Sequence, residues 1–115
     1  MALTTEQILS ADDLKKVRVD MPEWAPEGTD PAEAFGFVRR MTGDELDEYE
    51  EALRKKSDGN DTLTDYRGLR ATVVALTACD ENGVRLFTTA QVEALCKKAG
   101  DPVKRLFTAA ADLNG

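Results

Sequence analysis

Two short acidic segments contain the residue types that bind calcium. Residues 58–62 are Asp-Gly-Asn-Asp-Thr, and residues 80–83 are Asp-Glu-Asn-Gly. An EF-hand loop needs oxygen ligands at alternating positions, glycine at its sixth position and a bidentate acid at its twelfth. Glycine stands second in the first segment and fourth in the second. Because Asp, Asn and Gly also favour turns, we interpret both segments as turns and predict no metal site.

A run of acidic residues could supply paired catalytic carboxylates. Such pairs need buried carboxyl groups whose surroundings separate their pKa values. The acids alternate with Leu46, Tyr49 and Leu53, which have helical spacing, and this predicts that the acids lie opposite an apolar face. We therefore interpret the run as solvent-exposed surface, and its members are Asp44, Glu45, Asp47, Glu48, Glu50 and Glu51.

Other catalytic groups are scarce in the sequence. The chain has no histidine, which excludes His-based triads and His metal sites. Ser10 and Ser57 have no base beside them in the sequence. Cys79 and Cys96 form no CxxC pair and are expected to pack as small apolar side chains. We predict that the protein is not an enzyme and holds no cofactor.

The single tryptophan, Trp24, lies in a proline-rich segment. Tryptophan and arginine are the residue types that most often concentrate binding energy at protein interfaces. Phe37, Arg39 and Arg40 lie in a nearby apolar segment, where they could frame a partner surface or merely flank a strand. Trp24 itself could be a binding anchor or a cap on a small core. We predict a partner-binding surface formed by Trp24, Phe37, Arg39 and Arg40.

Length and charge narrow the classes of protein further. A chain of 115 residues with 42% apolar residues suits a single domain, residues 1–115, with a modest core. Fifteen basic residues face twenty-two acidic ones, giving a net charge of −7, which argues against nucleic acid and anionic membranes as partners. The apolar run 71–79 is too short to span a bilayer.

Two segments have the two-residue period of strands. Val17 and Val19 alternate with charged residues, which predicts a strand over 15–21. A second strand is expected over 35–41. Residues 22–34 contain three prolines, so we predict a flexible loop there, across which the strands could pair.

Helices are expected over most of the remaining chain. Capping-box pairs, in which two side chains satisfy backbone donors of the first turn, occur at Thr4/Gln7, Thr42/Glu45 and Thr88/Gln91. Periodicity predicts helices over 42–56, 65–78, 91–99 and 101–113, with a loop at 57–61 and Asp101 as an N-cap. The expected fold is α+β, predominantly helical, with a short N-terminal strand pair followed by about four helices. Its predicted core is Leu69, Val73, Leu76, Leu95, Leu106 and Phe107.

Three segments together resemble the tail assembly chaperones of long-tailed (siphovirus-type) bacteriophages and their prophage relatives. They are ILSADDLKKVRVDMPEW at 8–24, VRRMTGDELDEYEEAL at 38–53, and DENGVRLFTTAQVEALCKKAGDPVKRLFTAAADLNG at 80–115. The family pattern has a DDL segment before an extended stretch and PEW, then an R-x-x-TG-x-E helix start. A DE-x-G-x-RLF turn, two helices and a terminal LNG follow. Many relatives have a short glycine hairpin where this chain has the longer 25–34, which bears on whether the two strands pair.

The resemblance implies a non-enzymatic role in the cytoplasm of an infected bacterium. Such proteins bind the tape measure protein and help to recruit tail tube subunits, and many are made as a short product plus a frameshifted longer one. The alternative is a small acidic adaptor or regulatory protein unrelated to tails, and a neighbouring gene for a very long coiled-coil protein would distinguish the two. A homo-oligomer is left open.

Overall fold

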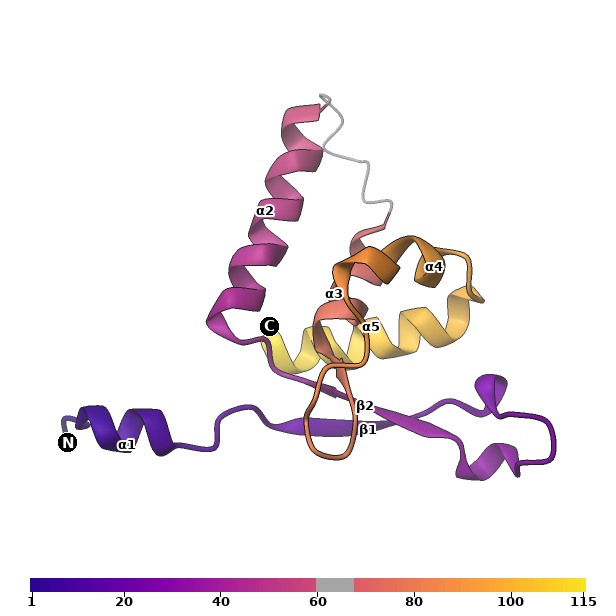
Figure 1. The fold of residues 1–115 in the computed structure, drawn as a ribbon, viewed down its shortest axis with the longest axis horizontal. Helices are drawn as coiled ribbons and strands as arrows, with labels where there is room; N and C mark the ends of the chain where they lie inside the picture. Colours follow the sequence, from indigo (N-terminus) through magenta and orange to yellow (C-terminus); the bar gives the residue numbers. More distant parts are fainter. Residues whose placement is uncertain (60–67) are drawn as a thin grey trace.

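The computed structural model describes residues 1–59 and 68–115, and its architecture is α+β and predominantly helical, as the sequence predicts. A twisted antiparallel sheet forms one layer, and α3, α4 and α5 lie on one side of it (Figure 1). Helix α2 projects away from this body, and α1 extends beyond the end of the sheet. The elements are α1 (Thr5–Ser10), β1 (Lys16–Asp20), β2 (Phe35–Arg39), α2 (Gly43–Gly59), α3 (Leu69–Thr77), β3 (Ala78–Cys79), α4 (Val92–Cys96) and α5 (Gly100–Asn114), with 3-10 turns at Pro22–Trp24, Pro31–Glu33 and Thr89–Gln91.

The two predicted strands pair, but β1 is one residue shorter at each end than the predicted 15–21, and β2 ends two residues before the predicted residue 41. The sheet order is β1-β2-β3, and the β1–β2 register runs from Lys16 opposite Arg39 to Asp20 opposite Phe35. The long 22–34 connection does not prevent pairing, because the Met21 N–H donates to the Ala34 carbonyl at 2.9 Å and closes the ladder beyond the strand ends.

Strand β3 was not predicted. It occupies Ala78–Cys79, where a helix was expected to end, and pairs with Phe37 and Val38 of β2. The run around it is apolar on every side, so helical periodicity alone does not mark the residue at which the chain turns from helix to strand.

The 22–34 connection, named the arm, has two single-turn 3-10 helices, Pro22–Trp24 and Pro31–Glu33. Arg105 of α5 holds it through both oxygens of Glu23, at 2.9 and 2.7 Å. This hydrogen-bonded pair lowers the pKa of Glu23 to about 2. The flexibility of the arm stays a prediction.

Several helix ends differ from the expected ones. Helix α2 continues through Ser57 to Gly59, where the start of a loop over 57–61 was predicted. The rest of that loop, and residues 60–62 of the turn predicted over 58–62, lie outside the described residues. Helix α3 begins after Gly68, whose φ of 85° is left-handed, rather than at residue 65; residues 65–67 lie outside the described ranges. Helix α4 spans only Val92–Cys96 rather than 91–99, and α5 begins at Gly100, so Asp101 lies in the first turn of α5 and is not its N-cap.

The predicted capping boxes and the second turn are confirmed. Thr4 with Gln7, Thr42 with Glu45, and Thr88 with Gln91 each form the reciprocal bonds. In the 80–83 segment, Asp80 Oδ1 accepts from the backbone N–H groups of Asn82 and Val84 at 2.8 and 3.0 Å, and Gly83 has a φ of 81°. These short-range bonds are the features that sequence spacing identifies well.

Helix α3 lies at the centre of the core. Five of the six predicted core residues are buried, while Phe107 is half-buried and packs against the cluster. Val19 and Val38 join them from the sheet. No helix in the described ranges has the length and hydropathy to cross a membrane.

We expect Leu76→Ala to lower the free energy of unfolding by about 2–5 kcal/mol, because this side chain is fully buried and truncation leaves a cavity. Denaturant unfolding measures the change. Leu9→Ala, on the exposed face of α1, is the control and should change stability by less than about 0.5 kcal/mol. An unchanged midpoint for Leu76→Ala would contradict the central place of α3.

Candidate functional site

The structure brings Trp24 and Phe37 to one surface cavity. This cavity, of about 300 Å³, lies between the arm, β2 and the 80–87 loop. We call it the aromatic groove and define it by the side chains that give it its character: Trp24, Pro26, Phe35, Phe37, Leu86 and Phe87. The sequence analysis did not place Leu86 and Phe87 at a site, because nothing in the local sequence shows that the 80–87 loop folds back beside β2.

Three cations border the aromatic rings of the groove. The Arg18 guanidinium lies 3.9 Å from the centre of the Phe35 ring, and Lys16 Nζ lies 5.6 Å from that of Phe37. Lys98 Nζ lies 5.8 Å from the Trp24 ring. Cations over ring faces are attracted by the ring quadrupole. Three rings of the groove thus each have a cation against them, while Asp80 and Glu81 lie beside Phe35, Phe37 and Leu86 in the adjoining cavity.

The position of Trp24 agrees in part with both interpretations that the sequence left open, a binding anchor and a cap on the core. It is half-buried and packs against the core cluster, so part of its ring caps the core. Another part lines the groove. Phe37 is also half-buried, and its ring meets Phe35 edge-to-face with centroids 5.6 Å apart. Trp24 and Phe37 can therefore each present part of a ring to a partner in the groove, and Phe37 also lines a neighbouring cavity beside Asp80 and Glu81.

Arg39 does not face the groove, because it forms a buried ion pair with Glu45. Only 5% of Arg39 and 8% of Glu45 is exposed. Arg39 Nη1 and Nη2 donate to the two oxygens of Glu45 at 2.7 and 2.9 Å. The guanidinium is thus used within the fold rather than presented to a partner.

The burial of Glu45 corrects the prediction that the whole acidic run is surface. Helix α2 turns Glu45, not Leu46, toward the body, and Leu46 stays exposed. Because a buried carboxylate needs a cation, the position of Arg39 decides which side of α2 faces inward. The prediction holds for the other five acids, which are exposed: Asp44, Asp47, Glu48, Glu50 and Glu51.

Further groups complete the environment of this ion pair. Arg39 Nε donates to the Gly83 carbonyl at 3.0 Å, and Arg85 Nη1 approaches Glu45 Oε2 at 3.6 Å. Burial by itself raises the pKa of Glu45. The hydrogen bonds from Arg39 and from the Thr42 backbone outweigh that effect, so the pKa lies below its ordinary value of 4.5.

Arg40 is exposed on a different part of the surface. It follows β2, and its Nε donates to the Leu113 carbonyl at the end of α5 at 3.2 Å. It does not line the aromatic groove. The four predicted partner-binding residues are therefore divided among a groove, a buried pair and a separate surface.

The described residues offer little for metal or thiol chemistry. Within residues 1–59 and 68–115, no group of three or more His, Cys, Asp or Glu is placed to hold a metal ion. Cys79 is buried in β3, where burial raises the pKa of its thiol, and Cys96 is exposed.

Comparison with known proteins finds a likeness of fold to a solved structure. No protein-family description matches the sequence, and no curated protein matches it. Among solved structures, the fold is similar to that of the bacteriophage HK97 tail assembly chaperone. The two are 18% identical, the match covers 94% of each chain, and the TM-score is 0.62. The fold expected from the sequence resemblance is thereby confirmed.

Arg39→Ala should lower the free energy of unfolding by about 3–5 kcal/mol, because it leaves the buried Glu45 carboxylate without its cation. Arg40→Ala removes a neighbouring, exposed arginine that makes one hydrogen bond to the Leu113 carbonyl, and it should cost less, about 0.5–1.5 kcal/mol. Denaturant unfolding of both variants measures the contrast. Equal effects would contradict the structural role assigned to Arg39.

Glu45→Gln tests the same ion pair through its pH dependence. Since the folded-state pKa of Glu45 is lowered, its charge stabilises the fold above pH 4.5 and stops doing so as pH falls through the folded-state value. The stability difference between wild type and Glu45→Gln should therefore be constant near neutral pH and shrink below about pH 4.5. Thermal melts across that range measure it, and a difference that does not shrink would exclude an ionised, stabilising Glu45.

Proposed function

We propose that the protein is a phage tail assembly chaperone that binds the tape measure protein and helps to recruit tail tube subunits in the host bacterial cytoplasm. The observation that carries the proposal is the likeness of fold to the bacteriophage HK97 tail assembly chaperone, which extends over 94% of both chains. The ordered sequence motifs at 8–24, 38–53 and 80–115 point to the same family. On this proposal the protein has no catalytic activity.

The aromatic groove is the part of the proposed partner surface that the geometry supports best. Its interior suits an apolar side chain, and Lys16, Arg18 and Lys98, which lie against its rings, would attract acidic residues beside that side chain. Trp24 and Phe37 would contact the partner there. Arg40 would contribute from its separate surface, and Arg39 would act only by holding β2, α2 and the 80–87 loop in place.

A groove of this size suits reversible binding. Its volume of about 300 Å³ is at the lower end of the 300–1,000 Å³ typical of pockets that bury a drug-sized ligand. It can hold one or two side chains of a partner segment rather than a whole element. An assembly factor must release its partner, so a small contact with few anchoring side chains is the kind of site such a role needs.

The test is capture of the tape measure protein encoded in the same genome by the tagged chain. Leu86→Glu should weaken capture at least about tenfold, because a carboxylate would have to be desolvated in the groove. Val84→Glu is a matched control two residues away: Val84 is 61% exposed and Leu86 53%, but only Leu86 lines the groove. Both substitutions are on exposed positions, and melting temperatures check that both variants fold.

The possible results test the proposed chaperone function separately from the proposed binding site in the aromatic groove. If wild type captures neither the tape measure protein nor the tail tube subunit, the proposed function is wrong and the adaptor alternative is favoured. If wild type captures a tail protein but Leu86→Glu and Val84→Glu behave alike, the function stands and the groove is not its site.

A further inference from the structure

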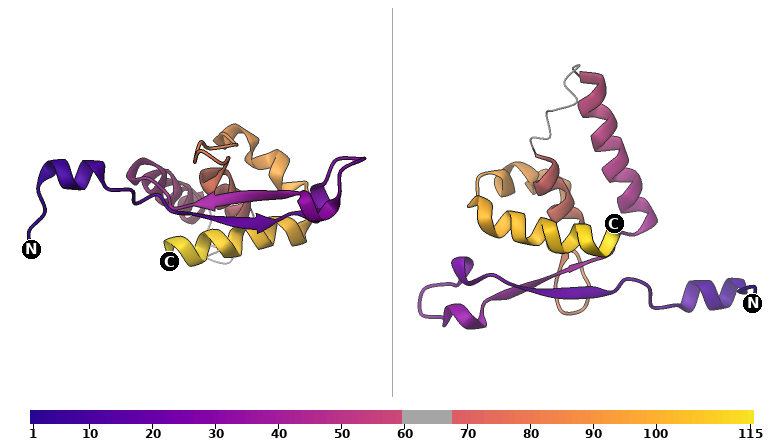
Figure 2. Two further views of the ribbon diagram at one scale, coloured as in Figure 1. Left: turned by 90° about the horizontal axis from the view of Figure 1, so that it is seen from below. Right: turned by 180° about the vertical axis from the view of Figure 1, so that it is seen from behind.

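The 80–87 loop presents an asparagine whose side-chain amide is unbound. This loop follows β3 and extends below the β1–β2 ribbon in Figure 1 and in the right-hand view of Figure 2. Asn82 is exposed in it, and its side chain makes no hydrogen bond within residues 1–59 and 68–115. Gly83 follows, and it has no side chain to shield its backbone nitrogen. This nitrogen can therefore approach the Asn82 amide carbon once the loop opens.

The same dipeptide occurs at Asn114–Gly115, where the amide is held on both sides. Asn114 is exposed too. Its Oδ1 accepts from the Met41 N–H at 2.8 Å, and its Nδ2 donates to the carbonyls of Ala110 and Arg39 at 2.8 and 3.5 Å. A reaction at this amide must first break these bonds. The fold therefore separates two sites that the sequence makes alike.

We propose, independently of the proposed function, that Asn82 is a site of spontaneous deamidation and that the fold protects Asn114. Asparagine is a thermolabile residue. The Gly83 backbone nitrogen loses its proton and attacks Cγ of Asn82, so that a C–N bond forms and the side-chain nitrogen leaves as ammonia. A five-membered succinimide remains. Water then opens either C–N bond of the ring that joins a carbonyl to nitrogen, which gives aspartate or isoaspartate.

Asp80 restrains this reaction, because it holds the turn closed. The Gly83 N–H donates to the Asp80 carbonyl at 3.0 Å, so the attacking nitrogen is occupied while the turn is formed. Asp80 Oδ1 accepts from the backbone N–H groups of Asn82 and Val84 at 2.8 and 3.0 Å. Exposed turns open locally at a small part of the free energy of global unfolding. The rate at Asn82 therefore follows the opening of this turn.

The isoaspartate product has a structural consequence that the aspartate product lacks. Isoaspartate routes the backbone through the β-carbon of position 82 and adds one carbon to the chain between Asp80 and Val84. The bond from the Asp80 N–H to the Val84 carbonyl, at 2.9 Å, closes this segment. The Gly83 carbonyl, which accepts from Arg39 Nε at 3.0 Å, lies inside it. The added length therefore displaces an acceptor of the buried Arg39 guanidinium.

Peptide mass spectrometry of the folded chain, aged at mildly alkaline pH, tests the proposal. Trypsin releases Asn82 in peptide 71–85 and Asn114 in peptide 106–115. The amide-to-acid mass change should accumulate at least about tenfold faster in 71–85, because two short hydrogen bonds must break at Asn114. A sample digested before aging corrects for deamidation during digestion. Equal rates in the two peptides, or no change in 71–85, would overturn the proposal.

Two further measurements separate the effect of the fold from that of the sequence. Aging in denaturant removes the bonds of Asn114, so the ratio of the two rates should fall several-fold. Asp80→Ala loses the bonds of Oδ1 and should raise the rate at Asn82 about fivefold. Asn82→Gln should stop the change in 71–85, because glutamine would have to close a larger ring. An unchanged ratio in denaturant, or an unchanged rate in Asp80→Ala, contradicts control by the fold.

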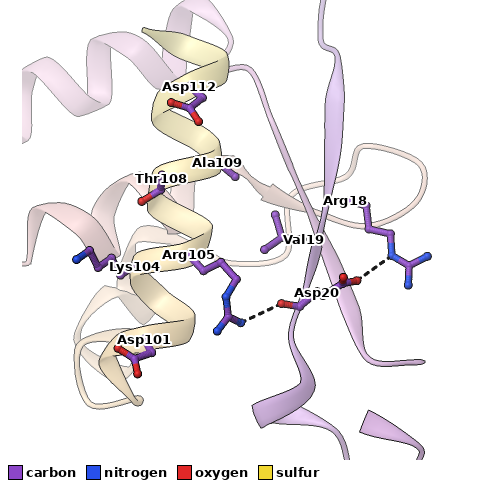
Figure 3. Close-up of a pocket in the computed structure, with 9 residues that line it drawn as sticks. All are labelled: Arg18, Val19, Asp20, Asp101, Lys104, Arg105, Thr108, Ala109 and Asp112. Carbon is purple, nitrogen blue, oxygen red and sulfur yellow. Dashed lines mark hydrogen bonds and ion pairs between the residues drawn. The ribbon is translucent and has the colours of Figure 1, made fainter. Parts of the chain in front are cut away.

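Melting temperatures test the displacement of the Gly83 carbonyl. The isoaspartate product, separated by ion exchange and identified by electron-transfer fragmentation, should melt about 4 °C or more below the aspartate product, the shift expected from loss of one hydrogen bond in a small domain. Asn82→Asp supplies the aspartate product directly. Thr108→Asp adds a carboxylate on α5 beside the cavity between α5 and β1 (Figure 3) and shows the effect of charge alone. Equal melting of the isoaspartate product and Asn82→Asp would overturn the displacement.

Discussion

The buried ion pair between Arg39 and Glu45 is the interaction that sets the arrangement of this fold. It joins the last residue of β2 to the first turn of α2, and Arg39 Nε reaches the Gly83 carbonyl in the 80–87 loop. Arg85 extends the contact, since its Nε donates to the Ala75 carbonyl of α3 at 2.7 Å. Strand β2, helix α2, the 80–87 loop and helix α3 thus meet around three charged side chains, Arg39, Glu45 and Arg85. Because a buried charge without a partner is costly, other orientations of α2 are disfavoured.

The C-terminal end of α5 contacts the residues that connect β2 to α2, next to this ion pair. Asn114 Oδ1 accepts from the Met41 N–H at 2.8 Å, and Arg40 donates to the Leu113 carbonyl. These bonds bring the last residues of the chain into contact with Arg40 and Met41, which connect β2 to α2. At the opposite end of α5, the Arg105–Glu23 pair holds the arm and so sets where Trp24 lies. Helix α5 therefore positions both ends of the β1–β2 ribbon.

The sequence predicted features that are decided over a few residues. Capping boxes, the Asp80 turn and the alternation of β1 depend on neighbours in the chain, and all are present in the structure. The burial of Glu45 could not be predicted in the same way. Its partner Arg39 was interpreted as a surface residue, and helical spacing placed Glu45 among exposed acids. Strand β3 and the groove position of Leu86 likewise depend on contacts between distant segments, which local patterns do not contain.

The cations beside the aromatic rings limit what a partner can place at the groove. Lys16 lies against the Phe37 ring and Arg18 against the Phe35 ring. Arg18 Nε also donates to Asp20 Oδ1 at 3.2 Å. An acidic side chain of a partner would have to compete with Asp20 for this guanidinium. The net attraction between such a partner and Arg18 is therefore smaller than the positive charge of Arg18 alone suggests.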